Sequence, residues 1–171
     1  DVADINDNGA AEIFVTNIHD ENRTLMSYVL EWDGKQFARI VQDARWYVRV
    51  LDHPRRGPVL VGQERDFEQP FRAGITEMAF NGVEYTPTIS GDLPLPRWVT
   101  VFGFNMGDVA DTGEEMTVAF SDRNYLRVLT GDNDKEWESE EPYMSGGLFI
   151  DYPDEASARI GDYRPQTRYY L

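Results

Sequence analysis

Four oxygen-bearing side chains stand close together near the start of the chain, with a spacing that suits a hard cation. They are Asp4, Asn6, Asn8 and Glu12. Ca²⁺ takes about six to eight oxygen ligands, and alternate residues of a tight loop supply them around a glycine such as Gly9. A helical calcium hand has a bidentate glutamate at its twelfth position, but this chain has Val15 there. The pattern therefore predicts a calcium loop of a non-helical kind.

The residues that follow the loop predict a β-strand. Ile13-Phe14-Val15-Thr16 is a β-branched and aromatic run, which is typical of strands. We therefore expect a calcium loop within a β-hairpin. Its two full carboxylates, Asp4 and Glu12, predict a weak affinity on the order of 10⁻⁴–10⁻³ M. The alternative interpretation is an Asx-rich turn that binds no metal.

Three segments repeat one local pattern, in which an apolar strand leads through a short turn to an aromatic residue. The segments are 31–37, 79–85 and 130–137. The first two carry Asp-Gly and Asn-Gly, the strongest short hairpin signal, and predict two-residue type I′ turns with positive φ at both turn residues. The aromatic residues Phe37, Tyr85 and Trp137 are separated by 48 and 52 positions.

A second marker recurs with a similar period. An aspartate follows a short apolar pair at Asp4, Asp52 and Asp111, spaced by 48 and 59 positions. When Asp1-Val2-Ala3-Asp4 is aligned with Asp108-Val109-Ala110-Asp111, the third loop is about three residues shorter than the first. A common period of about 50 residues is typical of β-propeller blades. The chain is predicted to be one propeller segment, 1–171, with approximate repeats 1–47, 48–96 and 97–171.

The residue pattern predicts an all-β protein with no helix. Strands are expected near 11–18, 24–32, 36–42, 45–51, 57–64, 74–81, 83–88, 98–105, 114–121, 124–130 and 135–139. Propellers close with about four to eight four-stranded blades, so three blades predict a partial propeller that further blades or self-association would complete. Residues 151–168, rich in proline, glycine and charge, are expected to form a long surface excursion.

Composition narrows the range of partners. The 171 residues carry a formal charge of -15, which repels nucleic acid and anionic membranes. Cysteine is absent, which excludes disulfides and thiolate metal sites. No apolar run approaches the roughly 18 residues of a membrane-spanning helix. Hydrophobic residues make up 41% of the chain, enough to predict a folded domain with a core.

The chain resembles the FG-GAP/VCBS-type β-propeller repeats of bacterial secreted and envelope proteins, which are related to the integrin α-chain propeller. The resemblance rests on Asp4-x-Asn6-x-Asn8-Gly9-x-x-Glu12 and on its echo at 108–116. It implies Ca²⁺ bound by the side chains of Asp4, Asn6, Asn8 and Glu12 and by the backbone carbonyl of Ala10. It also implies an extracytoplasmic location, whether periplasmic, outer-envelope or secreted.

The other two copies depart from the calcium pattern. The second has Arg55 and Arg56 where a cation would need oxygen. The third keeps only Asp111 and Glu115 as candidate ligands. We therefore expect one calcium ion and not three, with the role of stabilising a blade.

Signals for catalysis are weak. Only His19 and His53 are available as bases at neutral pH, and no nucleophile elbow or phosphate loop accompanies them. Acidic clusters at 64–68 and 136–141 leave a glycan-active enzyme as a minor alternative, although charged residues on an exposed edge strand explain them better. The expected function is non-enzymatic: a module for protein–protein or surface interaction.

Three tryptophans keep another function open. Packing between blades is the first interpretation of Trp46 and Trp98, and a place on an exposed outer strand is that of Trp137. A loop tryptophan can also stack on a sugar ring. The alternative is therefore a carbohydrate-binding propeller, or the accessory part of a polysaccharide-active enzyme. The expected partners are accordingly a protein or a surface glycan.

Overall fold

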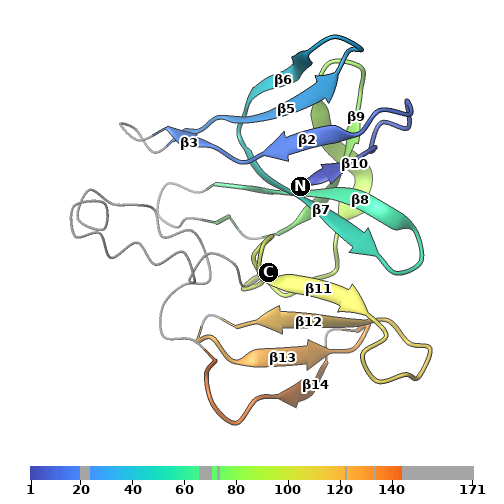
Figure 1. Ribbon diagram of the computed structural model, residues 1–171. Helices are drawn as coiled ribbons and strands as arrows, with labels where there is room; N and C mark the ends of the chain where they lie inside the picture. The colour runs from blue at the N-terminus through green and yellow to red at the C-terminus, as the bar shows by residue number, and fades with distance from the viewer. Residues whose placement is uncertain (20–23, 66–70, 73, 122, 133, 144–171) are drawn as a thin grey trace.

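The computed structural model describes residues 1–19, 24–65, 71–72, 74–121, 123–132 and 134–143. Within them the chain forms three four-stranded antiparallel sheets and one two-stranded hairpin, with no helix (Figure 1). The all-β prediction is therefore confirmed. The described part also contains no helix long and apolar enough to cross a membrane. The excursion predicted at 151–168 lies outside the described residues.

Each four-stranded sheet is a meander formed by one stretch of chain. The first sheet contains β1 (Val2–Ala3), β2 (Glu12–Val15), β5 (Ser27–Trp32) and β6 (Phe37–Ala44). The second contains β7 (Trp46–His53), β8 (Gly57–Glu64), β9 (Thr76–Phe80) and β10 (Tyr85–Asp92). The third contains β11 (Phe104–Gly107), β12 (Met116–Phe120), β13 (Leu126–Leu129) and β14 (Lys135–Glu138). A hairpin of β3 (Ile18–His19) and β4 (Thr24–Leu25) is inserted between β2 and β5.

Strands β7 and β8 of the second sheet are covered on both faces, because the first and third sheets lie on opposite sides of them (Figure 1). Alternate residues of a strand point to opposite faces. On β8, Leu60 packs toward the first sheet, whereas its neighbour Val61 packs toward the third. Both side chains are at most 1% exposed. This double burial explains the continuous apolar run of β8, since a strand covered on both faces needs no polar side.

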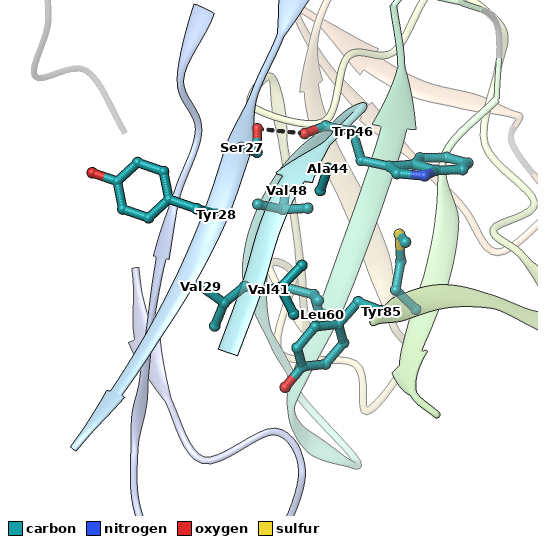
Figure 2. A pocket seen from close by; sticks show the side chains of 10 residues that line it. Ser27, Tyr28, Val29, Val41, Ala44, Trp46, Val48, Leu60 and Tyr85 are labelled. Atoms are coloured by element: carbon teal, nitrogen blue, oxygen red, sulfur yellow. Dashed lines mark hydrogen bonds between the residues drawn. The ribbon is translucent and has the colours of Figure 1, made fainter. Parts of the chain in front are cut away.

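The core between the first and second sheets is apolar and closely filled (Figure 2). Val29 of the first sheet belongs to the same buried cluster as Val48 and Leu60 of the second. The cavity between these sheets measures about 10 Å³, which is too small for any ligand larger than a water. At its edge, the Ser27 hydroxyl donates a 2.7 Å hydrogen bond to the Trp46 carbonyl.

Strand β7 contacts both neighbouring sheets. On one side its Val50 N–H donates to the carboxylate of Asp1, which directly precedes β1, at 2.9 Å. On the other side Arg49 donates to the carbonyl of Phe104 at 2.5 Å and to Asn105 Oδ1 at 2.6 Å, both on β11. Burial lowers the pKa of Arg49, although its guanidinium remains charged at neutral pH. The first strands of the three sheets, β1, β7 and β11, are therefore neighbours.

The two-residue type I′ turns predicted at Asp-Gly and Asn-Gly are wrong. Four residues, 33–36, connect β5 to β6, and among them only Gly34 has a positive φ, of 96°. The Asp33 side chain accepts the N–H groups of the two residues after Gly34, at 2.8 and 2.9 Å. Asn81 makes the same pair of hydrogen bonds in the β9–β10 connection. In each connection the Asx side chain stabilises the turn by accepting N–H groups within it, and a second residue with positive φ is not needed.

The strand predicted at 98–105 is displaced toward its C-terminal end, where β11 begins at Phe104. The segment before it forms turns, and the Val99 N–H donates to the Pro96 carbonyl at 3.0 Å. Val99 and Val101 are nevertheless at most 1% exposed, because they lie in the core between the second and third sheets. The apolar pattern thus indicated burial correctly, but these residues are buried in a turn.

Candidate metal centre

The predicted calcium loop connects β1 to β2, and its own side chains fold it. Asp4 Oδ1 and Oδ2 accept the backbone N–H groups of Asn8 and Gly9, at 3.1 and 2.9 Å. Asn6 Oδ1 also accepts the Asn8 N–H, at 3.1 Å. Asn8 Oδ1 accepts the N–H of Ala10, at 2.8 Å. Three of the four predicted side-chain ligands therefore accept hydrogen bonds from backbone N–H groups of residues 8–10.

Glu12, the fourth predicted side-chain ligand, is the first residue of β2 and is fully buried, with 0% exposure. Its Oε2 accepts the Ile5 N–H at 2.8 Å, and its Oε1 accepts the Tyr85 hydroxyl of β10 at 2.7 Å. None of the ion pairs among the described residues involves this carboxylate. Burial of an ionised carboxylate without a cation costs free energy, so a bound cation would offset a cost that the fold itself creates.

Glu31 is a further residue at this site, and it lies outside the loop pattern from which the other residues were predicted. It stands opposite Glu12 in the register of β2 and β5. Its Oε2 accepts hydrogen bonds from the side-chain amides of Asn6, at 3.0 Å, and Asn8, at 2.8 Å. This contact leaves the two amide oxygens turned toward the N–H groups of the loop. Cross-strand pairing could have identified Glu31, because residues directly opposite each other on paired strands have adjacent side chains on the same face of the sheet.

The hydroxyl of Tyr85 is under the electrostatic influence of three carboxylates of the first sheet and its β1–β2 loop. The Tyr85 side chain is buried, with 6% exposure. Burial raises the pKa of its hydroxyl above the ordinary value of 10.0, and the hydrogen bond to Glu12 raises it further. The negative charges of Glu12, Glu31 and Asp4 act in the same direction. A field of this sign favours a bound cation.

The donor set of the loop fits a hard cation. Carboxylate and amide oxygens are ligands that Ca²⁺ prefers. Each such oxygen has two lone pairs, so one that already accepts an N–H can still bind a metal. In the described part of the chain, no group of three or more His, Cys, Asp or Glu side chains is arranged to hold a metal. The amide oxygens of Asn6 and Asn8 and the carbonyl of Ala10 are therefore essential to a calcium site here.

The loop between β11 and β12 repeats the backbone arrangement of the β1–β2 loop. Asp108 accepts the N–H groups of Thr112 and Gly113, at 2.9 and 2.8 Å, as Asp4 does four and five positions further along its own loop. Positive φ angles recur at the fourth and sixth positions of both loops, 57° and 88° in the first and 55° and 79° in the second. Asp108 is therefore the counterpart of Asp4, and the two loops have equal length.

This register corrects the alignment of the third copy. The prediction that its loop is three residues shorter is wrong, and Asp111 and Glu115 do not occupy ligand positions. The third and ninth positions are Ala110 and Met116, which have no side-chain oxygen. Met116 is buried, so an apolar side chain fills the position that Glu12 fills in the first loop. The third loop thus keeps the backbone arrangement of the β1–β2 loop and has side-chain oxygens at its first and fifth positions, Asp108 and Thr112, but none at its third and ninth.

The second copy is a tight turn without the geometry of the β1–β2 loop. His53 pairs with Gly57, so only residues 54–56 separate β7 from β8. Arg56 extends to β9 and forms an ion pair with Glu77, with 2.7 Å between Nη1 and Oε2. Arg56, which stands where the calcium pattern needs an oxygen ligand, therefore has Glu77 as its ion-pair partner.

The three tryptophans predicted as stacking residues lie in three different places. Trp46 lines the small cavity between the first and second sheets. Trp98 packs against the core between the second and third sheets, with the guanidinium of Arg127 5.1 Å from its ring. Trp137 belongs to β14, the outermost strand of the third sheet, and is 47% exposed. The structure therefore does not bring them together on one surface.

Each acidic cluster has a carboxylate paired with an arginine, Glu64 with Arg72 and Glu138 with Arg127. Glu138, within 136–141, forms an ion pair with Arg127, and the hydrogen bond from this guanidinium lowers the pKa of Glu138. A general acid at neutral pH needs a raised pKa. The side chain of His19 and residues 66–68 of the other cluster lie outside the described part of the chain.

Comparisons with family models, with curated proteins and with solved structures gave no match. The resemblance to FG-GAP/VCBS repeats therefore depends on the residues of this chain alone. The described residues define an all-β fold with three consecutive four-stranded meanders, and the first of these carries the oxygen-rich loop.

Proposed function

We propose that this chain is a calcium-stabilised β-propeller module that acts through protein–protein or surface interaction outside the cytoplasm, and not as an enzyme. The observation that carries the proposal is Glu12, a fully buried carboxylate at the end of an oxygen-rich loop. Its charge has no ion-pair partner among the described residues. The calcium ligands would be the side chains of Asp4, Asn6, Asn8 and Glu12 and the carbonyl of Ala10.

The arrangement of the sheets supports the propeller part of the proposal. A propeller blade is a four-stranded antiparallel meander, and the described part of the chain contains three such meanders in succession. The sheets pack face to face, and their first strands lie next to one another (Figure 1). Closed propellers have about four to eight blades. Further sheets, from additional chain or from a second copy, would complete the ring.

Calcium would have a structural role in this module. When bound, the ion supplies the positive charge that the buried carboxylate lacks. Glu12 then connects the β1–β2 loop to Tyr85 of the second sheet through its 2.7 Å hydrogen bond. A loop held by the ion would therefore also hold the first sheet against the second.

An exposed aromatic pair supports the interaction part of the proposal. Trp32 and Phe37 flank the β5–β6 connection and are 48% and 55% exposed. Their ring centroids lie 5.2 Å apart in an edge-to-face arrangement. Aromatic residues are enriched at protein interfaces, and two together at a loop form a rigid apolar contact.

Calorimetry and thermal unfolding test the calcium proposal. Wild type should bind one Ca²⁺ and unfold at a higher temperature in calcium than in EDTA, with a gain of about 1.4 kcal/mol at tenfold excess over Kd. Asp4→Ala should lose both effects. Asp108→Ala, the matched change in the third loop, should keep both. Equal unfolding temperatures for wild type in calcium and in EDTA would overturn the proposal.

Carbohydrate binding is the second candidate function, because an open groove lies beside one end of the second sheet. The groove has a volume of about 880 Å³, and its lining includes Trp46, Arg72 and Arg97. An aromatic ring beside convergent polar groups is typical of small-molecule sites. A glycan array distinguishes this candidate: a specific signal that Trp46→Ala removes and Trp137→Ala keeps would favour it over protein interaction.

A further inference from the structure

We infer that the side-chain amide of Asn81 is a site of spontaneous covalent modification, where the backbone nitrogen of Gly82 displaces ammonia and closes a succinimide ring. Both residues are exposed in the connection between β9 and β10. The chain has two Asn-Gly pairs, at 8–9 and 81–82. A glycine gives the attacking nitrogen the least hindrance, because it has no Cβ. The structure distinguishes the two pairs, on grounds that do not depend on calcium binding.

The reaction needs water and hydroxide as its only co-reactants. The backbone nitrogen of Gly82 loses its proton to hydroxide and forms a bond to Asn81 Cγ, while negative charge develops on Oδ1. The bond from Cγ to the side-chain nitrogen then breaks, and this nitrogen takes a proton from water and leaves as ammonia. Water later opens the succinimide at one of its two carbonyls, which leaves an aspartyl or an isoaspartyl residue. Nothing is oxidised or reduced.

Two backbone N–H groups bind the oxygen on which this charge develops. Asn81 Oδ1 accepts the N–H groups of Val83, at 2.9 Å, and of Glu84, at 3.0 Å. Donors at such distances stabilise the tetrahedral intermediate of an acyl transfer. The attacking group is accessible, since the Gly82 N–H makes no hydrogen bond to a described residue. The turn therefore supports the reaction at both of its polar atoms.

The same dipeptide in the β1–β2 loop is protected. The Gly9 N–H, which would have to lose its proton, donates to Asp4 Oδ2 at 2.9 Å. The Asn8 side-chain nitrogen, which would have to leave, donates to Glu31 Oε2 at 2.8 Å. A carboxylate acceptor makes an N–H harder to deprotonate, because its negative charge favours the protonated form. Folding should therefore slow the reaction of Asn8 far more than that of Asn81.

The β5–β6 connection shows that a turn of this kind stabilises negative charge on the side chain. Asp33 accepts the N–H groups of Lys35 and Gln36, which stand two and three positions further on, as Val83 and Glu84 do after Asn81. The hydrogen bonds from Gln36 and Lys35 lower the pKa of the Asp33 carboxyl. An ionised carboxylate is a poor electrophile, so Asp33 does not react, whereas the neutral amide of Asn81 can.

The two products should differ in their effect on the fold. An aspartyl product has the side chain that Asp33 has in the same kind of turn. An isoaspartyl product adds a methylene to the backbone before Gly82, and the next paired residue after the turn is Tyr85. The Tyr85 hydroxyl donates to Glu12 at 2.7 Å. The isoaspartyl form should therefore weaken the contact between the second and first sheets.

Peptide mapping by mass spectrometry tests the inference on the whole chain. Wild type is incubated in EDTA at mildly alkaline pH, either folded or in urea, and a mass increase of about 1 Da is located by fragmentation. Folding should slow the reaction of Asn8 by about tenfold or more. It should slow that of Asn81 by less than about threefold, because the two oxyanion donors offset the lost flexibility. Equal slowing at both sites, or stronger slowing at Asn81, overturns the inference.

A variant tests the reason for the difference. Asp4→Ala frees the Gly9 N–H and should speed the reaction of Asn8 in the folded protein, with no change at Asn81. Asp108→Ala removes the matching carboxylate of the third loop and should change neither rate. An unchanged rate at Asn8 in Asp4→Ala would overturn the explanation by hydrogen bonding. Far-UV circular dichroism in EDTA confirms that the sheets of each variant remain folded.

Urea unfolding tests the effect of the modification. Asn81→Asp, which has the side chain of the aspartyl product, should unfold at the same urea concentration as wild type or at a higher one. Aged wild type in which an isoaspartyl methyltransferase labels position 81 should unfold at a lower concentration. Equal unfolding of the aged protein and Asn81→Asp would show that the modification leaves the Tyr85 contact intact.

Discussion

The Tyr85 hydroxyl donates a 2.7 Å hydrogen bond to the Glu12 carboxylate, and this contact joins the second sheet to the first. The two residues are 73 positions apart in the sequence. Glu12 closes the oxygen-rich loop, whereas Tyr85 follows the Asn81 turn and packs edge to face on Phe14, with 5.4 Å between ring centroids. One buried contact therefore couples the candidate metal centre to the packing of the core.

Removal of this hydroxyl should destabilise the protein. Tyr85→Phe should lower the free energy of unfolding by about 2 kcal/mol, because hydrogen bonds to charged groups contribute about 1.5–3 kcal/mol. Urea unfolding in EDTA measures the loss. Tyr28→Phe is the matched control, since the Tyr28 ring lies under the Arg39 guanidinium and its hydroxyl has no hydrogen bond to a described residue. Equal losses in the two variants would show that the Tyr85–Glu12 contact contributes nothing of its own.

The same contact predicts a loss of stability at alkaline pH. The pKa of Tyr85 is raised in the folded protein, chiefly by burial, from an ordinary value of 10.0. Above pH 10 the unfolded chain therefore releases a proton that the folded chain keeps, so stability falls as pH rises. The limiting slope is about 1.4 kcal/mol per pH unit for this one group. Urea unfolding between pH 9 and 11 should show a shallower fall in Tyr85→Phe than in wild type, and Tyr28→Phe should follow wild type.

Met116 in the third loop suggests how the buried carboxylate can be replaced. Glu12→Met alone should destabilise the calcium-free protein, because the Tyr85 hydroxyl and the Ile5 N–H lose their acceptor. Combining Glu12→Met with Tyr85→Phe removes both partners of the main contact. The double variant should therefore be more stable than the sum of the single changes predicts, with a coupling of about 1–3 kcal/mol.

Calcium provides the second part of this experiment. Neither variant that lacks Glu12 should gain thermal stability on addition of calcium, whereas Tyr85→Phe should still gain it. If the double variant remains calcium-responsive, Glu12 is not a ligand. If the effects of the two changes are additive in EDTA, the hydrogen bond does not couple the sheets.

Features that depend on local residue chemistry could be predicted from the sequence. The strand predicted at 57–64 is β8, Gly57–Glu64, because a turn and a run of apolar residues define both of its ends and its burial. The Asp33 and Asn81 turns were placed correctly but given the wrong geometry. Their side chains accept N–H groups two and three positions further on, an alternative that the Asp-Gly and Asn-Gly pairs do not distinguish from a type I′ turn.

Features that depend on strand pairing could not be predicted. Residue identity aligns Asp111 with Asp4, but the hydrogen bonds show that Asp108 is the counterpart of Asp4. Glu31 was missed for a related reason. Its position opposite Glu12 depends on how the chain returns after the inserted β3–β4 hairpin, and no periodicity in the sequence reports that distance.

Arg49 gives the last prediction, which concerns the contact between the second and third sheets. Its guanidinium donates to the carbonyls of Val101 and Phe104 and to Asn105 Oδ1. Arg49→Lys should lower the free energy of unfolding by about 2–3 kcal/mol, because an ammonium cannot reproduce this planar set of donors and leaves buried carbonyls without partners. Urea unfolding measures the effect.

Arg39→Lys is the control for this change. Arg39 is exposed on β6 and lies over the Tyr28 ring, 4.4 Å from its centroid, so its replacement should change the free energy of unfolding by less than about 0.5 kcal/mol. A small effect of Arg49→Lys, equal to that of Arg39→Lys, would mean that the apolar cluster of Leu51, Val61 and Val101 holds the two sheets together without help from the half-buried Arg49 guanidinium. A large difference would show that the packing of neighbouring meanders depends on polar contacts made by β7. The hydrogen bond from the Val50 N–H to the Asp1 carboxylate is a contact of this kind on the other side of β7.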